Sequence, residues 1–219
     1  MESLIVSSFR AIGSLFAPGM LGVFIKCVLV TVAALIGFVV FAGAFFTWMG
    51  GHMHGETASL LPWVGSIGSA AIAWLLFPGI MPVIASFFDE RIAALIESRD
   101  YPGSASHEPA FWPELLHDMR FSALTILLNI IVLPLYLFPV LFPFVFYGLN
   151  GYLLGREFFV MAAKRHMPVG EAEALRRRHG RSVLIAGILL ALLATVPVVN
   201  LFAPFWGIAV MVHLYHRLR

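Results

Sequence analysis

The chain has few charged side chains. Asp, Glu, Lys and Arg together make up 12% of its 219 residues, whereas hydrophobic residues make up 60%. An average soluble domain is about a quarter charged and about half apolar. So few charges cannot cover a surface that faces water, which excludes a soluble globular protein. The composition therefore predicts an integral membrane protein, and the length suits one membrane domain over residues 1–219.

Other features are also missing. Cys27 is the one cysteine, so no intrachain disulfide is possible and a disulfide-stapled secreted fold is excluded. The chain contains no phosphate-binding loop, which argues against ATP hydrolysis. The small net charge of +2 does not indicate nucleic-acid binding. No nucleophile and base occur at a plausible spacing, so we do not expect an enzyme, and we expect no cofactor.

Long apolar runs occupy the first half of the chain. Residues 1–18 have apolar side chains at helical spacing and end at Pro18-Gly19, which predicts a helix lying in the headgroup plane. Residues 20–49 and 63–88 are each long enough to cross about 30 Å of hydrocarbon. Pro78 and Pro82 should each kink the second of these spans.

Two later apolar stretches, residues 121–161 and 181–215, are each interrupted near the middle by prolines. The residues expected at the two turns are Pro134, Pro139, Pro197, Asn200 and Pro204. Three of the four arms measure about 20 to 25 Å as helix, which is short for an upright crossing. The sequence therefore favours two re-entrant helical hairpins, with the second arm of the first hairpin long enough to cross. The expected fold is all-α, with an interfacial helix, two transmembrane helices and two hairpins.

The positions of the cations test this arrangement. With two spans and two hairpins, every Lys and Arg except Lys26 lies on one face, and only residues 50–61 lie opposite. That is the positive-inside pattern, so this face and both termini are expected to be cytoplasmic. Four full crossings would instead export the cationic segment 155–180. Six full crossings would distribute charge in the same way as two spans with hairpins, and only arm length favours the hairpins.

Several charged residues are candidates for a site. Lys26 lies about one turn inside the first span, where it either faces an anion pathway or extends to the headgroups. Glu114, Asp118 and Arg120 cluster before the first hairpin and form either a polar network at a pore entrance or a solvated interfacial face. A denser patch, which either anchors lipid or first meets an anionic substrate, consists of Arg176, Arg177, Arg178 and Arg181.

Histidines do not predict a metal site. His52, His54 and Glu56 have suitable side chains, but one short loop flanked by glycine offers no fixed tetrahedral arrangement. His213 and His216 are expected to mark the membrane interface instead. The sequence therefore predicts no metal.

The C-terminal part carries a specific family resemblance. The cationic segment RRRHGRS is followed by an apolar arm and then by TVPVVNLFAPFWGIAVMV, in which Pro197, Asn200, Leu201 and Pro204 match a family pattern. This arrangement resembles the CysZ sulfate permeases and the wider etoposide-induced-protein family. The order of elements also agrees over most of the chain.

The resemblance implies an oligomeric permease of the bacterial inner membrane, passing sulfate or a similar oxyanion inward for sulfur assimilation, with lipids around it. It also places the anion site after the early Pro-Gly, at Gly19, Met20 and Leu21, with Lys26 nearby. The family's arginine is absent from this stretch, which reads PGMLGVF. The alternative is a non-transporting scaffold of the same family that organises lipid or partner proteins.

Overall fold

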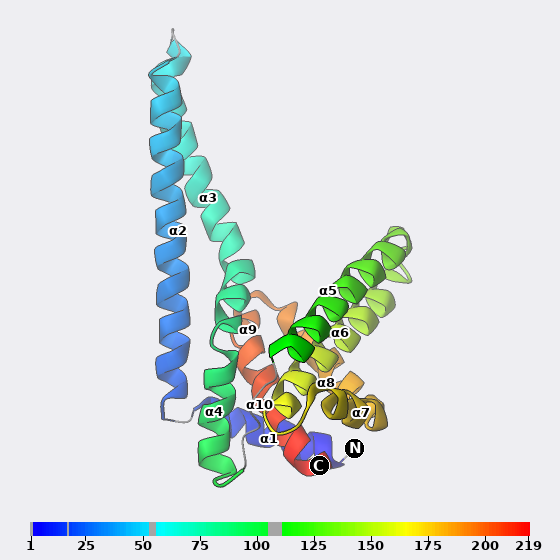
Figure 1. The fold of residues 1–219 in the computed structure, drawn as a ribbon. Helices are drawn as coiled ribbons and strands as arrows, with labels where there is room; N and C mark the ends of the chain where they lie inside the picture. Colours follow the sequence, from blue (N-terminus) through cyan, green and yellow to red (C-terminus); the bar gives the residue numbers. More distant parts are fainter. Residues whose placement is uncertain (1, 17, 53–55, 105–110) are drawn as a thin grey trace. The chain divides into compact units, whose positions relative to one another are not determined.

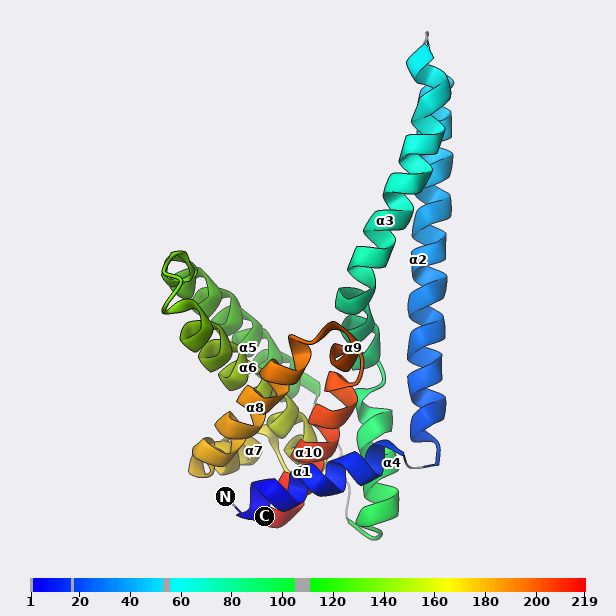
Figure 2. The same cartoon turned by 180° about the vertical axis from the view of Figure 1, so that it is seen from behind.

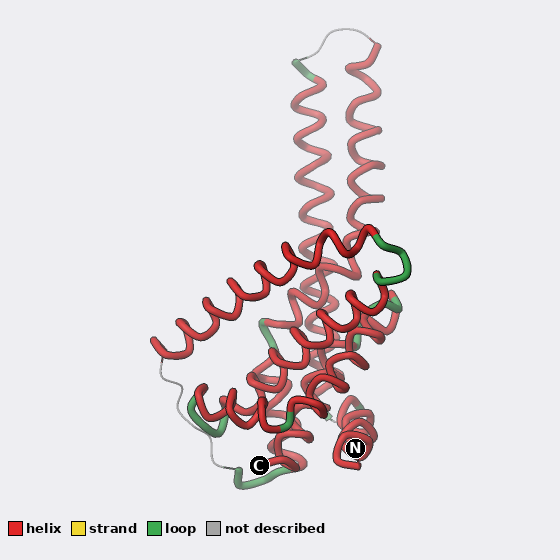
Figure 3. The backbone as a smooth tube through the Cα atoms, turned by 90° about the vertical axis from the view of Figure 1, so that its right-hand side faces the viewer, coloured by secondary structure: helices red, strands yellow, loops and turns green. Residues whose placement is uncertain are grey.

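The structure is a computed structural model that describes residues 2–16, 18–52, 56–104 and 111–219. In those ranges the chain forms helices joined by turns and contains no strand, as the ribbon and the tube both show (Figures 1 and 3). The predicted all-α membrane fold is therefore confirmed. The chain divides into two compact units, one of residues 22–88 and one that combines residues up to Leu21 with residues 89–219.

The unit of residues 22–88 is a pair of long helices. Helix α2 (Met20–Gly50) and helix α3 (Glu56–Ser86) have 31 residues each and lie side by side in both ribbon views (Figures 1 and 2). Each helix is about 45 Å long, more than a bilayer core requires. A Cβ atom added to Gly43 would lie 3.2 Å from the Ser66 hydroxyl, so a small residue permits close helix contact there.

Helix α3 is bent as the sequence predicts. Its parts Pro62–Phe77 and Gly79–Ser86 meet at an angle of 58°, and the break coincides with residue 78. Proline removes one backbone hydrogen bond and its ring crowds the preceding turn, which explains a bend at this position. The helix continues through Pro82 to Ser86, so the second predicted kink does not interrupt it.

The other unit is organised around α10 (Ala203–Leu218). Twelve of its sixteen residues are buried. It contacts α1 (Glu2–Leu15), α4 (Asp89–Asp100), α6 (Phe142–Lys164) and α8 (Gly180–Ala194). A helix that is apolar on every side is stable only when it is surrounded, and these neighbours surround α10.

Helix α1 has two different faces. Ser7, Ala11 and Ser14 are buried, and α1 contacts α10. Phe9 and Phe16 are 72% and 83% exposed. Small side chains allow the two helices to approach closely, while the exposed aromatic rings suit insertion into the lipid headgroup region. The predicted interfacial helix is therefore present as a helix that ends at Leu15, before Pro18-Gly19.

The first hairpin begins earlier than the sequence indicated. Its first arm is α5 (Phe111–Val132), which is extended by a short 3-10 helix, η1 (Leu133–Leu137). Residues 112–137 form a span of 26 residues that is apolar and long enough to cross a membrane. The expectation of a short arm starting at residue 121 is therefore wrong. Charged residues at 114, 118 and 120 suggested a boundary, but the helical apolar spacing continues through them, and Pro113 is tolerated in the first turn.

The second hairpin follows the predicted pattern. Helix α7 (Val169–Arg178) precedes it, and its arms are α8 and α10, joined by the short α9 (Pro197–Asn200). Helix α8 has 15 residues, about 22 Å, which is short for an upright crossing. Prolines stand in the first turn of η1, α6, α9 and α10, where the missing amide hydrogen costs no helical bond.

Glycines set the contact between α6 and α8. A Cβ atom added to Gly155 would lie 2.6 Å from the Val183 carbonyl oxygen, and one added to Gly187 would overlap the Gly151 carbonyl. The two backbones therefore touch where side chains are absent. In lipid, where apolar contacts do not drive helices together, this close approach provides the packing energy.

By length and composition, the described residues contain two helices able to cross a membrane, residues 20–50 and 112–137. The bent pair in α3 raises this number to three if it counts as one span.

Candidate functional site

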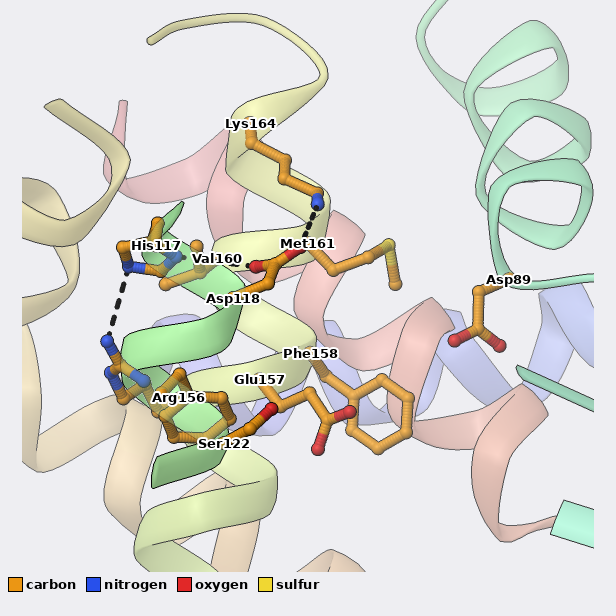
Figure 4. A pocket seen from close by; sticks show the side chains of 11 residues that line it. Asp89, His117, Asp118, Ser122, Arg156, Glu157, Phe158, Val160, Met161 and Lys164 are labelled. Atoms are coloured by element: carbon orange, nitrogen blue, oxygen red, sulfur yellow. Dashed lines mark hydrogen bonds and ion pairs between the residues drawn. The ribbon is translucent and has the colours of Figure 1, made fainter. Parts of the chain in front are cut away.

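A polar cavity of about 290 Å³ lies between α5 and α6, with one wall formed by the start of α4 (Figure 4). Six charged or ionisable side chains line it, together with Ser122 and four apolar residues. The six are Asp89, His117, Asp118, Arg156, Glu157 and Lys164. So many ionisable groups around one cavity, in a chain with few charges, make it the candidate functional site.

Lys164 connects the two arms of the first hairpin at this cavity. Its ammonium nitrogen lies 3.4 Å from a Glu114 carboxylate oxygen and 3.6 Å from one of Asp118. Glu114 and Asp118 are four residues apart on α5 and therefore share a face, as the sequence predicts. The lysine that pairs them comes from the last turn of α6, which the sequence did not indicate.

Arg156 is the buried cation of the cavity. Its side chain is 10% exposed, and its Nε donates to Glu173 Oε1 at 3.4 Å. One terminal nitrogen, Nη2, lies 3.2 Å from His117 Nε2, and the guanidinium sits 3.9 Å from the centre of the Phe121 ring. The other terminal nitrogen, Nη1, is buried and has no hydrogen-bond partner among the described residues. A guanidinium with one unused donor is suited to bind an oxyanion.

Asp89 lies on the opposite side of the cavity from Arg156 and His117 (Figure 4). Burial, and secondarily the negative charge of Glu157, raises the pKa of Asp89 from 3.8 to about 7. Its Oδ1 is buried without a hydrogen-bond partner in the described part of the chain. A carboxyl group with this pKa changes charge near neutral pH, so the charge balance of the cavity depends on pH.

The structure therefore assembles part of the predicted polar network. Glu114 and Asp118 meet at Lys164, whereas Arg120 is exposed and makes no ion pair or hydrogen bond with the residues described. The sequence interpretation missed Arg156, His117 and Lys164. Arg156 had a usable signal, because a lone arginine within an apolar helical arm is costly unless it is partnered.

The segment expected to bind an anion does not line this cavity. Gly19 has a φ of +91°, a left-handed conformation that favours glycine, and it makes the turn before α2. Met20 is 2% exposed and Leu21 is 63% exposed. Lys26 belongs to the other compact unit and is exposed. The assignment of these four residues to an anion site stays a prediction.

The cationic patch after α6 divides into buried and exposed members. Arg176 is buried, donates to Glu173 Oε1 at 2.8 Å and faces the Tyr152 ring at 5.6 Å. Arg177, Arg178 and Arg181 are exposed. Arg176 therefore stabilises the fold. Arg177 also lies 3.5 Å from Glu173 Oε1 although its side chain is mostly exposed, and Arg178 and Arg181 are available to headgroups or solutes.

The expected turn residues occupy the breaks between helices. Pro134 lies in η1, Pro139 lies between η1 and α6, and Pro197 and Asn200 are the first and last residues of α9. Pro204 is buried in the first turn of α10. They lie at helix boundaries, and none of the described side chains among them lines the cavity.

The histidines near the C-terminus lie in a second polar cluster. His213 is fully buried and is hydrogen-bonded to Ser14 at 3.0 Å and to Tyr101 at 2.8 Å, so it connects α10 with α1 and α4. His216 packs flat on Tyr101, with ring centres 3.8 Å apart. Tertiary contacts enclose both residues, and their expected position at the membrane interface stays a prediction.

Glu97 occupies the centre of this second cluster. Arg165 donates to Glu97 Oε2 from Nε at 3.2 Å and from Nη2 at 3.1 Å, and His166 Nε2 lies 2.8 Å from Oε1. Burial alone would raise the pKa of Glu97, but the imidazoles of His216 and His166 and the Arg165 guanidinium more than offset this and lower it to about 2. Of the loop residues considered for metal, His52 bonds to the Trp48 carbonyl at 2.7 Å, and His54 lies outside the described residues.

Comparison with known proteins gives one match. A sequence model of the family described as sulfate transporter CysZ/etoposide-induced protein 2.4 matches residues 7–204, which is most of the chain. Neither the curated proteins nor the solved structures include a match to this chain. The long apolar helices and the proline-broken hairpins fit this family assignment. The chain is thus a membrane protein of the sulfate transporter CysZ/etoposide-induced protein 2.4 family.

Proposed function

We propose that the protein is a permease for sulfate or a related small oxyanion. In this proposal the cavity between α5 and α6 is a site that the anion occupies transiently as it permeates. The observation that carries the proposal is the unused Nη1 donor of Arg156, buried in a polar cavity of a chain from a sulfate transporter family. The resident location we propose is the bacterial inner membrane, with the basic segments cytoplasmic and the protein acting as a homo-oligomer.

The chemistry of the cavity supports an oxyanion more than a halide. Arg156 offers N–H donors in a planar, forked arrangement, and His117 and Ser122 add polar groups nearby. Tetrahedral oxyanions accept several hydrogen bonds at once, which a guanidinium is shaped to provide. Phe121 covers one face of the guanidinium, so Arg156 is held in place before an anion arrives.

The charge balance argues for weak binding, which suits transport. Arg156 and Lys164 are the two cations of the cavity, and the carboxyl groups of Asp89, Asp118 and Glu157 offset them when ionised. A bound anion must compete with these carboxylates, so it is not held tightly. A permeant ion needs a site that it can enter and leave.

Uptake of labelled sulfate into proteoliposomes tests the proposal. We expect flux above empty vesicles for the wild-type chain, and loss of most of that flux in Arg156→Gln. Losing a charge-assisted hydrogen bond costs about 1.5 to 3 kcal/mol, which corresponds to a loss of affinity of about 10- to 100-fold. Arg156→Lys keeps the positive charge but loses the planar arrangement of N–H donors, so its flux should lie between those of the wild type and Arg156→Gln. Arg120→Gln is the matched control, because Arg120 is exposed.

The outcomes separate this function from the scaffold alternative. No flux above empty vesicles, together with no thermal stabilisation by sulfate, sulfite or phosphate, would exclude the permease. Flux that is equal in the wild-type chain and Arg156→Gln would keep the permease and move its anion site elsewhere, with Gly19 and Lys26 as the next positions to test.

A further inference from the structure

The second polar cluster contains three side chains of the types that bind transition metals. Glu97 of α4, His166 just after α6 and His216 of α10 each offer one ligand atom, and all three ligand atoms lie within 4.8 Å of one another. The three residues are far apart in sequence, and all belong to the same compact unit. Their side chains are 8%, 4% and 6% exposed, respectively.

We propose that Glu97, His166 and His216 form a binding site for a divalent transition-metal ion, with Zn²⁺ the best fit. Two imidazoles and one carboxylate are a known ligand set for zinc, and three protein ligands leave a fourth position open. None of the three residues lines the proposed anion cavity.

His216 provides an independent observation that points to a ligand. Its Nε2 is buried and has no hydrogen-bond partner among the described residues, although it is directed to within 3.9 Å of Glu97 Oε1. That distance is too long for a hydrogen bond and short enough for two ligands of one metal ion. Leaving a buried ring nitrogen unpaired costs free energy, and coordination to a metal would remove this cost.

The distances fit a small rearrangement around an ion. Ligands at about 2.0 to 2.1 Å from a tetrahedral zinc lie about 3.3 Å from one another. Here His166 Nε2 lies 2.8 Å from Glu97 Oε1, and His216 Nε2 lies 3.9 Å from the same oxygen. One distance is shorter and one longer than the ideal, so rotations of the side chains can accommodate the ion without moving the helices.

The surrounding groups hold these ligands in position. Arg165 donates two hydrogen bonds to Glu97 Oε2, which leaves Oε1 facing the histidines. The His166 ring stacks on Tyr215 with the planes 7° apart, and the His216 ring stacks on Tyr101 with the planes 12° apart. Outer groups that fix ligand orientation are characteristic of metal sites and strengthen binding.

A bound ion would connect three helices of this unit. Glu97, His166 and His216 lie at the ends of α4, α6 and α10, so coordination would tie these ends together. Metal ligands must be deprotonated, so the affinity for the ion should increase with pH. We therefore expect the ion to stabilise the fold of this unit.

Titration of the purified full-length chain in detergent tests the site, with a purification tag that contains no histidine. We expect one equivalent of Co²⁺ to give intense visible absorption bands, Zn²⁺ to displace it, and Zn²⁺ to raise the thermal unfolding temperature by several degrees over EDTA. His216→Phe keeps a ring on Tyr101 but removes the ligand nitrogen, so it should lower Zn²⁺ affinity at least tenfold. In EDTA its unfolding temperature should equal or exceed that of the wild type.

The control is His52→Phe, which removes an exposed histidine from the other unit and should leave Zn²⁺ affinity unchanged. X-ray absorption of the zinc-loaded wild-type chain should show two imidazole ligands, and this measurement does not depend on any variant. The site is absent if no stoichiometric binding occurs, if the spectrum shows fewer than two imidazoles, or if His216→Phe binds Zn²⁺ as tightly as the wild type. None of these results depends on sulfate flux, so the two proposals fail independently.

Discussion

Arg156 and Glu173 form an ion pair in which both side chains are about nine-tenths buried, with Nε 3.4 Å from Oε1. The pair joins α6 to α7, and Arg176 binds the same carboxylate oxygen at 2.8 Å. Burying a charge is costly unless a partner compensates it, so loss of Glu173 would leave two guanidinium groups with reduced compensation. Glu173 therefore fixes the cation that we propose as the anion-binding group.

Glu173→Gln should destabilise the protein at neutral pH and reduce its sensitivity to acid. Burial alone would raise the pKa of Glu173, but the hydrogen bond and charge of Arg176, with those of Arg156, lower it below its ordinary 4.5. A carboxylate with a lowered pKa contributes its full stability above pH 4.5, and that contribution is lost as pH falls through the pKa in the folded state.

We expect a loss of about 2 kcal/mol at pH 7, which is about 5 °C in unfolding temperature for a chain of this size. Below pH 4.5 the difference between variant and wild type should shrink. Glu171→Gln is the control, because Glu171 is exposed on the same helix. The measurement is thermal unfolding in detergent from pH 7 to pH 3.5. A constant difference across this range would contradict the role assigned to Glu173.

Sulfate binding should strengthen as pH falls from 8 to 6, and Asp89→Asn should reduce this dependence. Because the pKa of Asp89 is about 7, the group is mostly ionised at pH 8 and mostly neutral at pH 6. Removing one negative charge from the cavity should increase oxyanion affinity by up to about tenfold.

Isothermal titration of sulfate at three pH values measures the effect of Asp89. Glu90→Gln is the control, since Glu90 is the exposed neighbour on α4. Equal pH dependence in Asp89→Asn and the wild type would show that Asp89 does not govern binding.

Gly155→Ala should destabilise the contact between α6 and α8, whereas Gly148→Ala should not. A Cβ atom at Gly155 would lie 2.6 Å from the Val183 carbonyl oxygen, while one at Gly148 would meet nothing within 4 Å. Overpacking costs about 1 to 3 kcal/mol, and alanine in an uncrowded helical position gains slightly over glycine. Unfolding temperatures of the two variants, each made by the same one-carbon addition, test the packing directly. Equal stability of both variants would argue against close contact of these helices.

Lys164→Ala should reduce sulfate flux with only a small loss of stability. Lys164 neutralises Glu114 and Asp118 at the cavity, so removing it leaves net negative charge there and repels an oxyanion. The ion pairs are partly exposed, and such pairs contribute about 1 kcal/mol or less to stability. Arg120→Ala removes a cation of the other arm of this hairpin, one that has no ion pair in the described structure, so its flux should match the wild type. If Lys164→Ala and Arg120→Ala lose flux equally, the effect does not come from the ion pairs of Lys164 with Glu114 and Asp118.

The sequence predicted most of the secondary structure because its signals are local. Apolar runs of 20 residues or more are long enough to span a bilayer, and the prolines lie where helices break. The sequence interpretation underestimated the length of the first hairpin arm, because Glu114, Asp118 and Arg120 suggested that this stretch lies at the membrane surface. Helical hydrogen bonding continues through polar residues when the apolar face is maintained, so α5 begins at Phe111.

The candidate site was predicted less completely, for a physical reason. Glu114 and Asp118 share one helix face, a relation that spacing alone reveals. Their partner Lys164 is contributed by α6, and Arg156 is paired with α7, and no local pattern gives these pairings. Arg156 and Lys164 could not be assigned to the site from sequence, because their partners depend on which helices pack together.

By itself, the sequence determined that this chain belongs in a membrane and which family it belongs to, because composition, run length and ordered motifs are properties of the chain in one dimension. Only the tertiary structure decided which charges become partners and which stay exposed. Packing of α4, α6 and α10 brings Glu97, His166 and His216 together across 119 residues of chain, from position 97 to position 216. Such proximity follows from the packing of distant segments, and sequence spacing carries no record of it.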